Sequence, residues 1–191
     1  MTVRLHLVCS AATALTRVVG FAGDEPLDTC GQESLASMVD RLPACDLVLC
    51  SPALSARQTV EGLQLAATAE PRLRECDFGR WAGRSFEEIQ SNDPDAIAEW
   101  MENPHAAPHG GESLSGVTKR IAGWMDEMLS TDDSVLVITH ALVIRAAVAH
   151  ALGAGAEIFR HIDVGPLTRV KLSGGGGRWT LASLVPLRDQ R

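Results

Sequence analysis

The sequence lacks the features that would assign it to several common classes of protein. It has no basic run, and its net charge of −7 over 191 residues disfavours nucleic acid and anionic membranes as partners, because phosphate binding needs clustered Lys and Arg. No stretch is long and apolar enough to cross a bilayer. The five cysteines are odd in number and show no Cys-x-x-Cys spacing, so we expect no zinc site and no other cofactor. Free thiols of this kind indicate a reducing, cytoplasmic location.

What the sequence does contain is a set of strand-like segments. Three short runs rich in Val, Leu and Ile, at residues 3–9, 46–50 and 134–140, predict strands buried on both faces, as in parallel sheets. The first run follows Arg4 and loosely resembles a secretion signal, but a histidine interrupts it, and we interpret it as a strand. Residues 167–185 predict a closing hairpin that turns within its run of four glycines.

Helical spacing of apolar residues appears in four segments. The first follows Thr29 and Gln32, which we interpret as a capping box. The four segments are residues 33–42, 52–66, 115–129 and 141–153. The order of elements predicts an α/β fold, with a three-layer α/β/α arrangement around a mostly parallel central sheet. We expect one domain over residues 1–191, with an irregular insertion at about 73–111.

The residues that follow the predicted strands mark a candidate site. In open parallel sheets, ligands bind beyond the carboxyl ends of the strands. The first run ends at Cys9 and Ser10, the second reaches Ser51, and the third ends at His140. A histidine between a buried strand and a helix start lies in a positive field that keeps it neutral or favours anions. Ser51 is interpreted as a loop or cap residue, so Ser10 and His140 are the stronger candidates.

Five blocks in sequence order carry a resemblance to a known family. They are LHLVCSAAT, LCSPALSARQT, LRECDFGRWAGRSFEEI, HGGESL and VLVITHALVIR. With these blocks the chain resembles the histidine phosphatase superfamily, the phosphoglycerate mutase-like proteins, over nearly its whole length. The resemblance implies their fold and a two-step phosphoryl transfer, in which a histidine attacks phosphorus and a carboxylic acid protonates the leaving oxygen. Two arginines and a second histidine hold the phosphate, because a nearly dianionic group needs cationic, bidentate donors. The attacking histidine must be unprotonated, which an imidazole can be near neutral pH.

Carried over residue by residue, the resemblance keeps some of these positions and changes others. Glu75 matches the acid, His140 matches the second histidine, and Thr13 is retained. Glu112 and Ser113 resemble the block at the mouth of the pocket. The changed positions are Cys9 for the motif arginine, Ser10 for the nucleophilic histidine, Ala11 for a glycine, Thr16 for an asparagine, Ser55 for the second arginine and Ala141 for a glycine.

The changes at Cys9, Ser10 and Ser55 are expected to remove the ordinary activity. A hydrogen bond to a charged group contributes about 1.5–3 kcal/mol, so two missing arginines remove roughly 3–6 kcal/mol of phosphate binding, or ~10²–10⁴ in affinity. Loss of a covalent nucleophile costs on the order of 10⁶ in rate. Serine cannot simply substitute, because its hydroxyl needs a general base.

Nearby arginines are weak candidates to compensate. Residues two apart on a helix point in different directions, so Arg57 should not occupy the site of Ser55. Arg145, one helical turn past His140, could face the pocket. We interpret Arg17 and the other two as surface or partner-helix charges.

The sequence therefore favours a binding or regulatory pseudoenzyme, with a small-molecule ligand in the former phosphate pocket. One alternative is a reassigned enzyme, in which Ser10 or Cys9 acts as the nucleophile, His140 as the base and Glu75 as the acid. The other is a weak residual phosphomonoesterase with His140 itself as the nucleophile. The resemblance also implies a homodimer.

Overall fold

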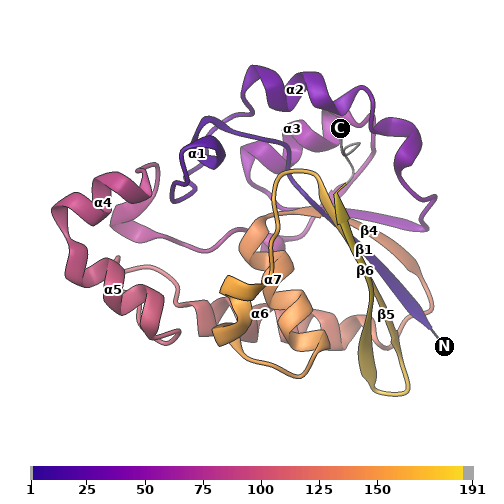
Figure 1. Cartoon of the computed structure of the whole chain (residues 1–191). Coiled ribbons are helices and arrows are strands. Elements are labelled where there is room, and N and C mark those ends of the chain that lie inside the picture. Colours follow the sequence, from indigo (N-terminus) through magenta and orange to yellow (C-terminus); the bar gives the residue numbers. More distant parts are fainter. Residues whose placement is uncertain (1, 187–191) are drawn as a thin grey trace.

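One six-stranded sheet, in the order β3-β2-β4-β1-β5-β6, organises the computed structural model, which describes residues 2–186 (Figure 1). Strands β1 to β4 pair in parallel, whereas β5 runs antiparallel to β1 and to β6. The strands are β1 (Val3–Cys9), β2 (Leu47–Cys50), β3 (Thr68–Ala69), β4 (Ser134–Thr139), β5 (Thr168–Gly175) and β6 (Arg178–Pro186). The mostly parallel sheet predicted from the apolar runs is thus confirmed, and β3 is the one short strand that the sequence did not indicate.

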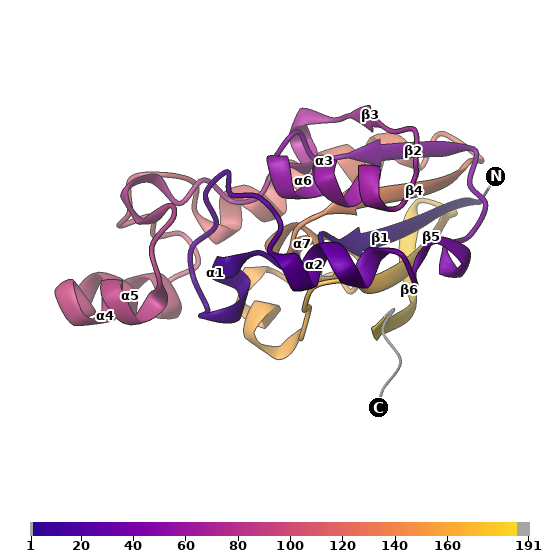
Figure 2. The same cartoon turned by 90° about the horizontal axis from the view of Figure 1, so that it is seen from above.

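Helices cover both faces of this sheet, as the sequence predicts (Figure 2). The α-helices are α1 (Ala14–Arg17), α2 (Thr29–Leu35), α3 (Leu54–Gly62), α4 (Phe86–Asn92), α5 (Pro94–Glu102), α6 (Leu114–Met128) and α7 (Ala141–Ala151). The 3₁₀ helices are η1 (Val39–Arg41), η2 (Pro71–Leu73), η3 (Gly79–Trp81) and η4 (Ala156–His161). None of the helices between residues 2 and 186 is long and apolar enough to span a membrane.

The core has two parts because successive strand residues face opposite sides of the sheet. Leu7 and Val137 belong to the larger cluster, which includes the apolar faces of α6 and α7. Val8 and Ile138 belong to the smaller cluster, together with residues of α2 and α3. Strands buried on both faces explain the continuous apolar runs in the sequence, and they give the three-layer α/β/α arrangement.

Two predicted helices have other bounds in the structure, since the helix predicted at residues 33–42 ends at Leu35 and that predicted at residues 52–66 ends at Gly62. The caps explain where they begin. The helix predicted at residues 33–42 begins earlier, since the carboxylate of Asp28, not Thr29, caps α2 by accepting the Gly31 N–H at 2.6 Å. The Thr29 and Gln32 capping box is therefore absent from α2. The next helix begins at Leu54 rather than at residue 52, because the Leu54 N–H donates to the carboxylate of Asp24 at 2.7 Å.

The segment predicted as an insertion contains η3, α4 and α5, which extend beyond one side of the sheet (Figures 1 and 2). Its aromatic side chains pack around Phe21, which lies in the loop before α2. The Phe21 ring centroid is 4.9 Å from that of Trp81, 5.2 Å from that of Phe78 and 5.5 Å from that of Trp100. Aromatic contacts with the N-terminal loop therefore fix α5 in place, at distances typical of favourable ring pairs.

A pair of glycine substitutions tests how closely α2 packs on the loop after β1. A Cβ built at Gly31 would lie 2.2 Å from the Ala12 carbonyl oxygen, whereas one at the exposed Gly123 of α6 would meet nothing within 4 Å. We expect Gly31→Ala to lower the free energy of unfolding by about 1–3 kcal/mol. Gly123→Ala should raise it by about 0.5–1 kcal/mol, because it removes a helical glycine. Urea denaturation followed by circular dichroism measures both, and a Gly31→Ala protein as stable as the wild type would contradict the packing.

Candidate functional site

Three strand ends meet at one edge of the sheet, where the candidate site lies. In the register of β1 and β4, Cys9 pairs with Thr139, and in that of β2 and β4, Cys50 pairs with Ile138. The backbone pairing continues one residue further on each side. The Ser10 N–H donates to the Thr139 carbonyl at 2.7 Å, and the Ser51 N–H donates to the Ile138 carbonyl at 2.9 Å. This pairing brings Ser10, Ser51 and His140 to the same edge.

His140 forms its side-chain hydrogen bond with Ser51, not with Ser10. Its Nε2 lies 2.7 Å from the Ser51 hydroxyl oxygen, and both side chains are buried. Burial and, to a lesser degree, the charge of Arg120 lower the pKa of His140 to about 4, so the imidazole is neutral near pH 7. The Ser10 hydroxyl has no hydrogen-bond partner among residues 2–186, although Ser10 is buried. The direct Ser10–His140 contact that a reassigned nucleophile needs is therefore not formed.

Glu75 lies against the start of α7 and retains the character of an acid. It is half-buried, and its carboxylate accepts hydrogen bonds from the backbone N–H groups of Cys76, at 2.9 Å, and of Leu142. Burial raises the pKa of Glu75 to about 7, against the opposing effect of these bonds and of Arg145 and Arg120. A carboxyl group that keeps its proton near neutral pH has the property that a general acid needs.

The first strand end contributes uncharged groups only. Burial raises the pKa of the Cys9 thiol to about 12, so it carries no thiolate at neutral pH. The Ala11 N–H donates to the Thr59 hydroxyl oxygen at 3.0 Å, and that hydroxyl donates to the Ser55 carbonyl at 2.7 Å. Ser55 is itself buried on α3. The loop after β1 is thus tied to α3 by neutral hydrogen bonds.

Two arginines influence the pKa values at the site, and both have structural partners. Arg120 donates from Nε and Nη2 to the two carboxylate oxygens of Glu112, at 2.9 and 2.7 Å, and from Nη1 to the Arg74 carbonyl at 3.0 Å. Arg145 donates from Nε to the Ile162 carbonyl at 2.9 Å. Arg120 therefore links α6 to the segment that precedes Glu75.

The other arginines considered as replacements lie outside the site. Arg57 is exposed on α3 whereas Ser55 is buried, so the two side chains face different ways, as the helical spacing predicts. Arg17 is exposed and forms an ion pair with Asp28. Neither occupies the position of a phosphate-binding arginine.

The remaining residues predicted to line the pocket have structural partners of their own. Thr13 and Thr16 form a capping box at the start of α1, and the Thr13 hydroxyl donates to Glu25 at 3.1 Å. Ser113 caps α6 by accepting the Gly116 N–H at 3.1 Å, while Glu112 binds Arg120 and Ala141 is the first residue of α7. Whether any of them also contacts a ligand stays a prediction.

Sequence reasoning gave too little weight to two residues of the site. Ser51 is a loop residue, as predicted, and its hydroxyl accepts the Ala53 N–H at 3.2 Å. Its contact with His140 joins positions 89 apart in the sequence, which no local pattern reveals. Thr59 is not among the predicted site residues, although its position four residues after Ser55 places both on the same face of the helix. Within residues 2–186, no group of three or more His, Cys, Asp or Glu side chains is placed to hold a metal ion.

The fold and the site define an α/β protein with a cluster of polar side chains at the carboxyl edge of its sheet, among them a neutral histidine and a protonatable glutamate. The chain belongs to the histidine phosphatase superfamily, since the family model for branch 1 of that superfamily matches residues 5–185. It is 30% identical over 162 residues to phosphoserine phosphatase 1 of Hydrogenobacter thermophilus, covering 79% of this chain and 77% of that protein. These two matches confirm the family predicted from the five motif blocks.

Two further relatives illustrate how far the similarity extends. A bifunctional protein of Mycobacterium tuberculosis is 30% identical over 132 residues, which are 67% of this chain but 35% of that longer protein. A mutant phosphoserine phosphatase from Entamoeba histolytica, solved with phosphoserine, superposes with a TM-score of 0.87 at 17% identity, covering 99% of this chain and 100% of the other. At that identity the superposition shows the fold alone.

His140 and Glu75 should make the free energy of unfolding depend on pH in opposite directions. The pKa of His140 falls from 6.5 to about 4, so its contribution is present above about pH 6.5 and is lost as the pH falls toward 4. The pKa of Glu75 rises from 4.5 to about 7, so its contribution is present below about pH 4.5 and is lost as the pH rises through 7. Between about pH 4.5 and pH 6.5, each group changes the free energy of unfolding by up to about 1.4 kcal/mol per pH unit, and the two changes have opposite signs.

Compared with the wild type, Glu75→Gln should therefore gain stability more steeply from about pH 4.5 to about pH 6.5, and His140→Gln less steeply. Urea denaturation across this range measures the slopes. The double variant should return to the wild-type slope, because both contributions are then absent. Slopes that change in the same direction in the two single variants would contradict the opposite effects of burial on these groups.

Proposed function

We propose that this member of the histidine phosphatase superfamily is a binding or regulatory pseudoenzyme, which holds a ligand without the phosphohistidine chemistry that the motif resemblance implies. The observation that carries the proposal is the end of β1. There, Ser10 offers a hydroxyl without a partner among the described residues, beside a Cys9 thiol that stays neutral at pH 7. Neither group can serve as an attacking imidazole.

The distribution of positive charge supports this proposal. A phosphate dianion is held best by guanidinium groups with donors to spare. At this site, Arg120 uses all three of its guanidinium nitrogens on Glu112 and backbone carbonyls, whereas Arg145 uses only its Nε, on Ile162. The positions matched to the two family arginines are Cys9 and Ser55, both buried and uncharged. A neutral or weakly polar ligand suits such a pocket better than a phosphate.

Ordinary phosphomonoester hydrolysis is the second candidate function, and specific observations favour it. Relatives that match over much of this chain are named as phosphatases, including one for phosphoserine. Glu75 has the raised pKa of a general acid, and the neutral His140 has a lone pair for nucleophilic attack on phosphorus. Attack through Nε2 would require His140 to give up its hydrogen bond with Ser51, whereas attack through Nδ1 would leave that bond in place.

A reassigned nucleophile has less support. Cys9 would have to ionise against a pKa raised to about 12 by burial. Ser10 would have to replace Ser51 as the hydrogen-bond partner of His140 before its proton could be removed. Ser51 already has the required contact, but it is fully buried, at 0% exposure, and so is closed to a substrate.

Two wider aspects belong to the same proposal. We place the protein in the cytoplasm, since its five cysteines are free thiols, which persist in a reducing compartment. The expected homodimer also remains a proposal.

A turnover assay tests the proposed loss of catalysis. We expect hydrolysis of phosphoserine, of phosphoglycerates and of a generic aryl phosphate by the purified protein to stay at background. The combined variant Cys9→Arg, Ser10→His and Ser55→Arg should hydrolyse at least one of them measurably, because it restores the nucleophile and both cations to a site that keeps Glu75 and His140.

Controls separate the three hypotheses. Wild-type turnover that falls with Glu75→Gln and His140→Gln but not with Ser10→Ala would overturn the pseudoenzyme in favour of a residual phosphatase. Labelling of Ser10 by a serine-reactive fluorophosphonate, lost in His140→Gln, would instead support a reassigned nucleophile. Thermal melts of each variant confirm that the comparison is made between folded proteins.

A further inference from the structure

A second candidate site, which we call the second cavity, lies between α5, the start of α7 and η4 and adjoins the strand-end site through Leu142 and Arg145. Its volume is about 220 Å³. It is open to solvent, since Met101 and Arg160 are exposed. Apolar side chains make up much of its wall, including Trp100 and Met101 from α5, Leu142 from α7 and Phe159 from η4. Neither Ser10, Glu75 nor His140 lines it.

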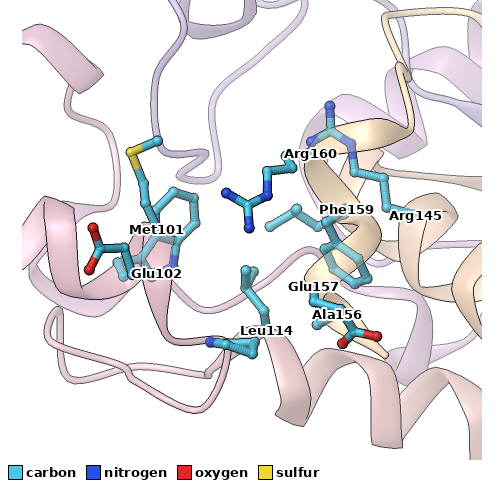
Figure 3. A pocket seen from close by; sticks show the side chains of 11 residues that line it. Met101, Glu102, Leu114, Arg145, Ala156, Glu157, Phe159 and Arg160 are labelled. Atoms are coloured by element: carbon cyan, nitrogen blue, oxygen red, sulfur yellow. The ribbon is translucent and has the colours of Figure 1, made fainter. Parts of the chain in front are cut away.

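Two arginines line this apolar cavity, and one of them faces its middle. Figure 3 shows the guanidinium of Arg160 reaching over the middle of the cavity, between Met101 and Phe159, whereas that of Arg145 lies at the edge and turns away from the middle. Within residues 2–186, Arg160 makes no hydrogen bond or ion pair, and Arg145 donates only from its Nε, to Ile162. Donors of these arginines are therefore available to a ligand, at the rim of an otherwise apolar space.

The acidic residues of the cavity do not neutralise these arginines. Figure 3 shows the carboxylates of Glu102 and Glu157 on opposite sides, pointing away from the middle. The Glu157 carboxylate accepts the Gly155 N–H at 2.9 Å, within its own turn. Because the rest of the wall is largely apolar, the cavity suits a ligand with one small anionic group on an apolar body.

We propose that this cavity binds a small amphipathic monocarboxylate, with its flat apolar body between Trp100, Met101 and Phe159 and its carboxylate on Arg160. A planar carboxylate matches the fork of a guanidinium, which can donate two parallel hydrogen bonds to it. The inference goes beyond the proposed function, because it concerns a different ligand at a different set of residues. Binding at this cavity can be measured whether or not the strand-end site turns over phosphate.

Calorimetric titration with 2-naphthoate and its neutral isostere 2-naphthamide tests the proposal. We expect the wild type to bind naphthoate at least about tenfold more tightly than the amide, as a charge-assisted hydrogen bond predicts. Arg160→Gln should abolish that preference and leave amide binding unchanged. Met101→Ala should weaken both probes, because it removes apolar wall. Arg178→Gln is the matched control, since Arg178 is equally exposed but lies on the β5–β6 hairpin and does not line the cavity.

Several outcomes would overturn the inference. These are no saturable naphthoate binding by the folded wild type, equal affinity for naphthoate and naphthamide, and unchanged naphthoate affinity in Arg160→Gln. Displacement of naphthoate by inorganic phosphate would show that a simple anion site, not an amphipathic one, is present. Naphthoate contains no phosphoryl group, so failure of this test would not change the interpretation of the turnover assay. Phosphatase activity in the wild type would likewise not contradict naphthoate binding in the second cavity.

Discussion

The position of β4 between β1 and β2 is the constraint on which the site depends. Parallel pairing on both sides of β4 ends the three strands at the same level, so the residues that follow them meet. The Ser51–His140 hydrogen bond of 2.7 Å joins two of these strand ends directly. The extended apolar runs that build the strands therefore also build the site, because a shift of register by one residue would turn every side chain to the other face.

Burial then determines which protons the site holds. The same loss of solvent that keeps His140 neutral keeps Glu75 protonatable and Cys9 a thiol, since each loses the hydration of its charged form. Positively charged side chains lie near the site, and some of them hold other parts of the fold together. Arg120, for example, holds Glu112 and the chain just before Glu75. This arrangement of protons and charges is the basis of the proposed pseudoenzyme.

The sequence was sufficient to predict the parts of the molecule that depend on local patterns. The apolar runs located β1, β2 and β4, and the residues after them pointed to the site edge. Contacts between distant segments were beyond its reach. The N-terminus of α3 is set by Asp24, 30 residues away, and the hydrogen-bond partner of His140 is 89 residues away. The second cavity depends on α5 and η4, which only the tertiary fold brings together.

The most direct test of the account is calorimetric titration of the wild-type protein with inorganic phosphate, since the central claim is a strand-end site without free cations. We predict no saturable binding until the concentration reaches the millimolar range, because the nearest guanidinium groups are engaged elsewhere or lie in the second cavity. Saturable binding with micromolar affinity, lost when His140 is replaced by Gln, would contradict the claim.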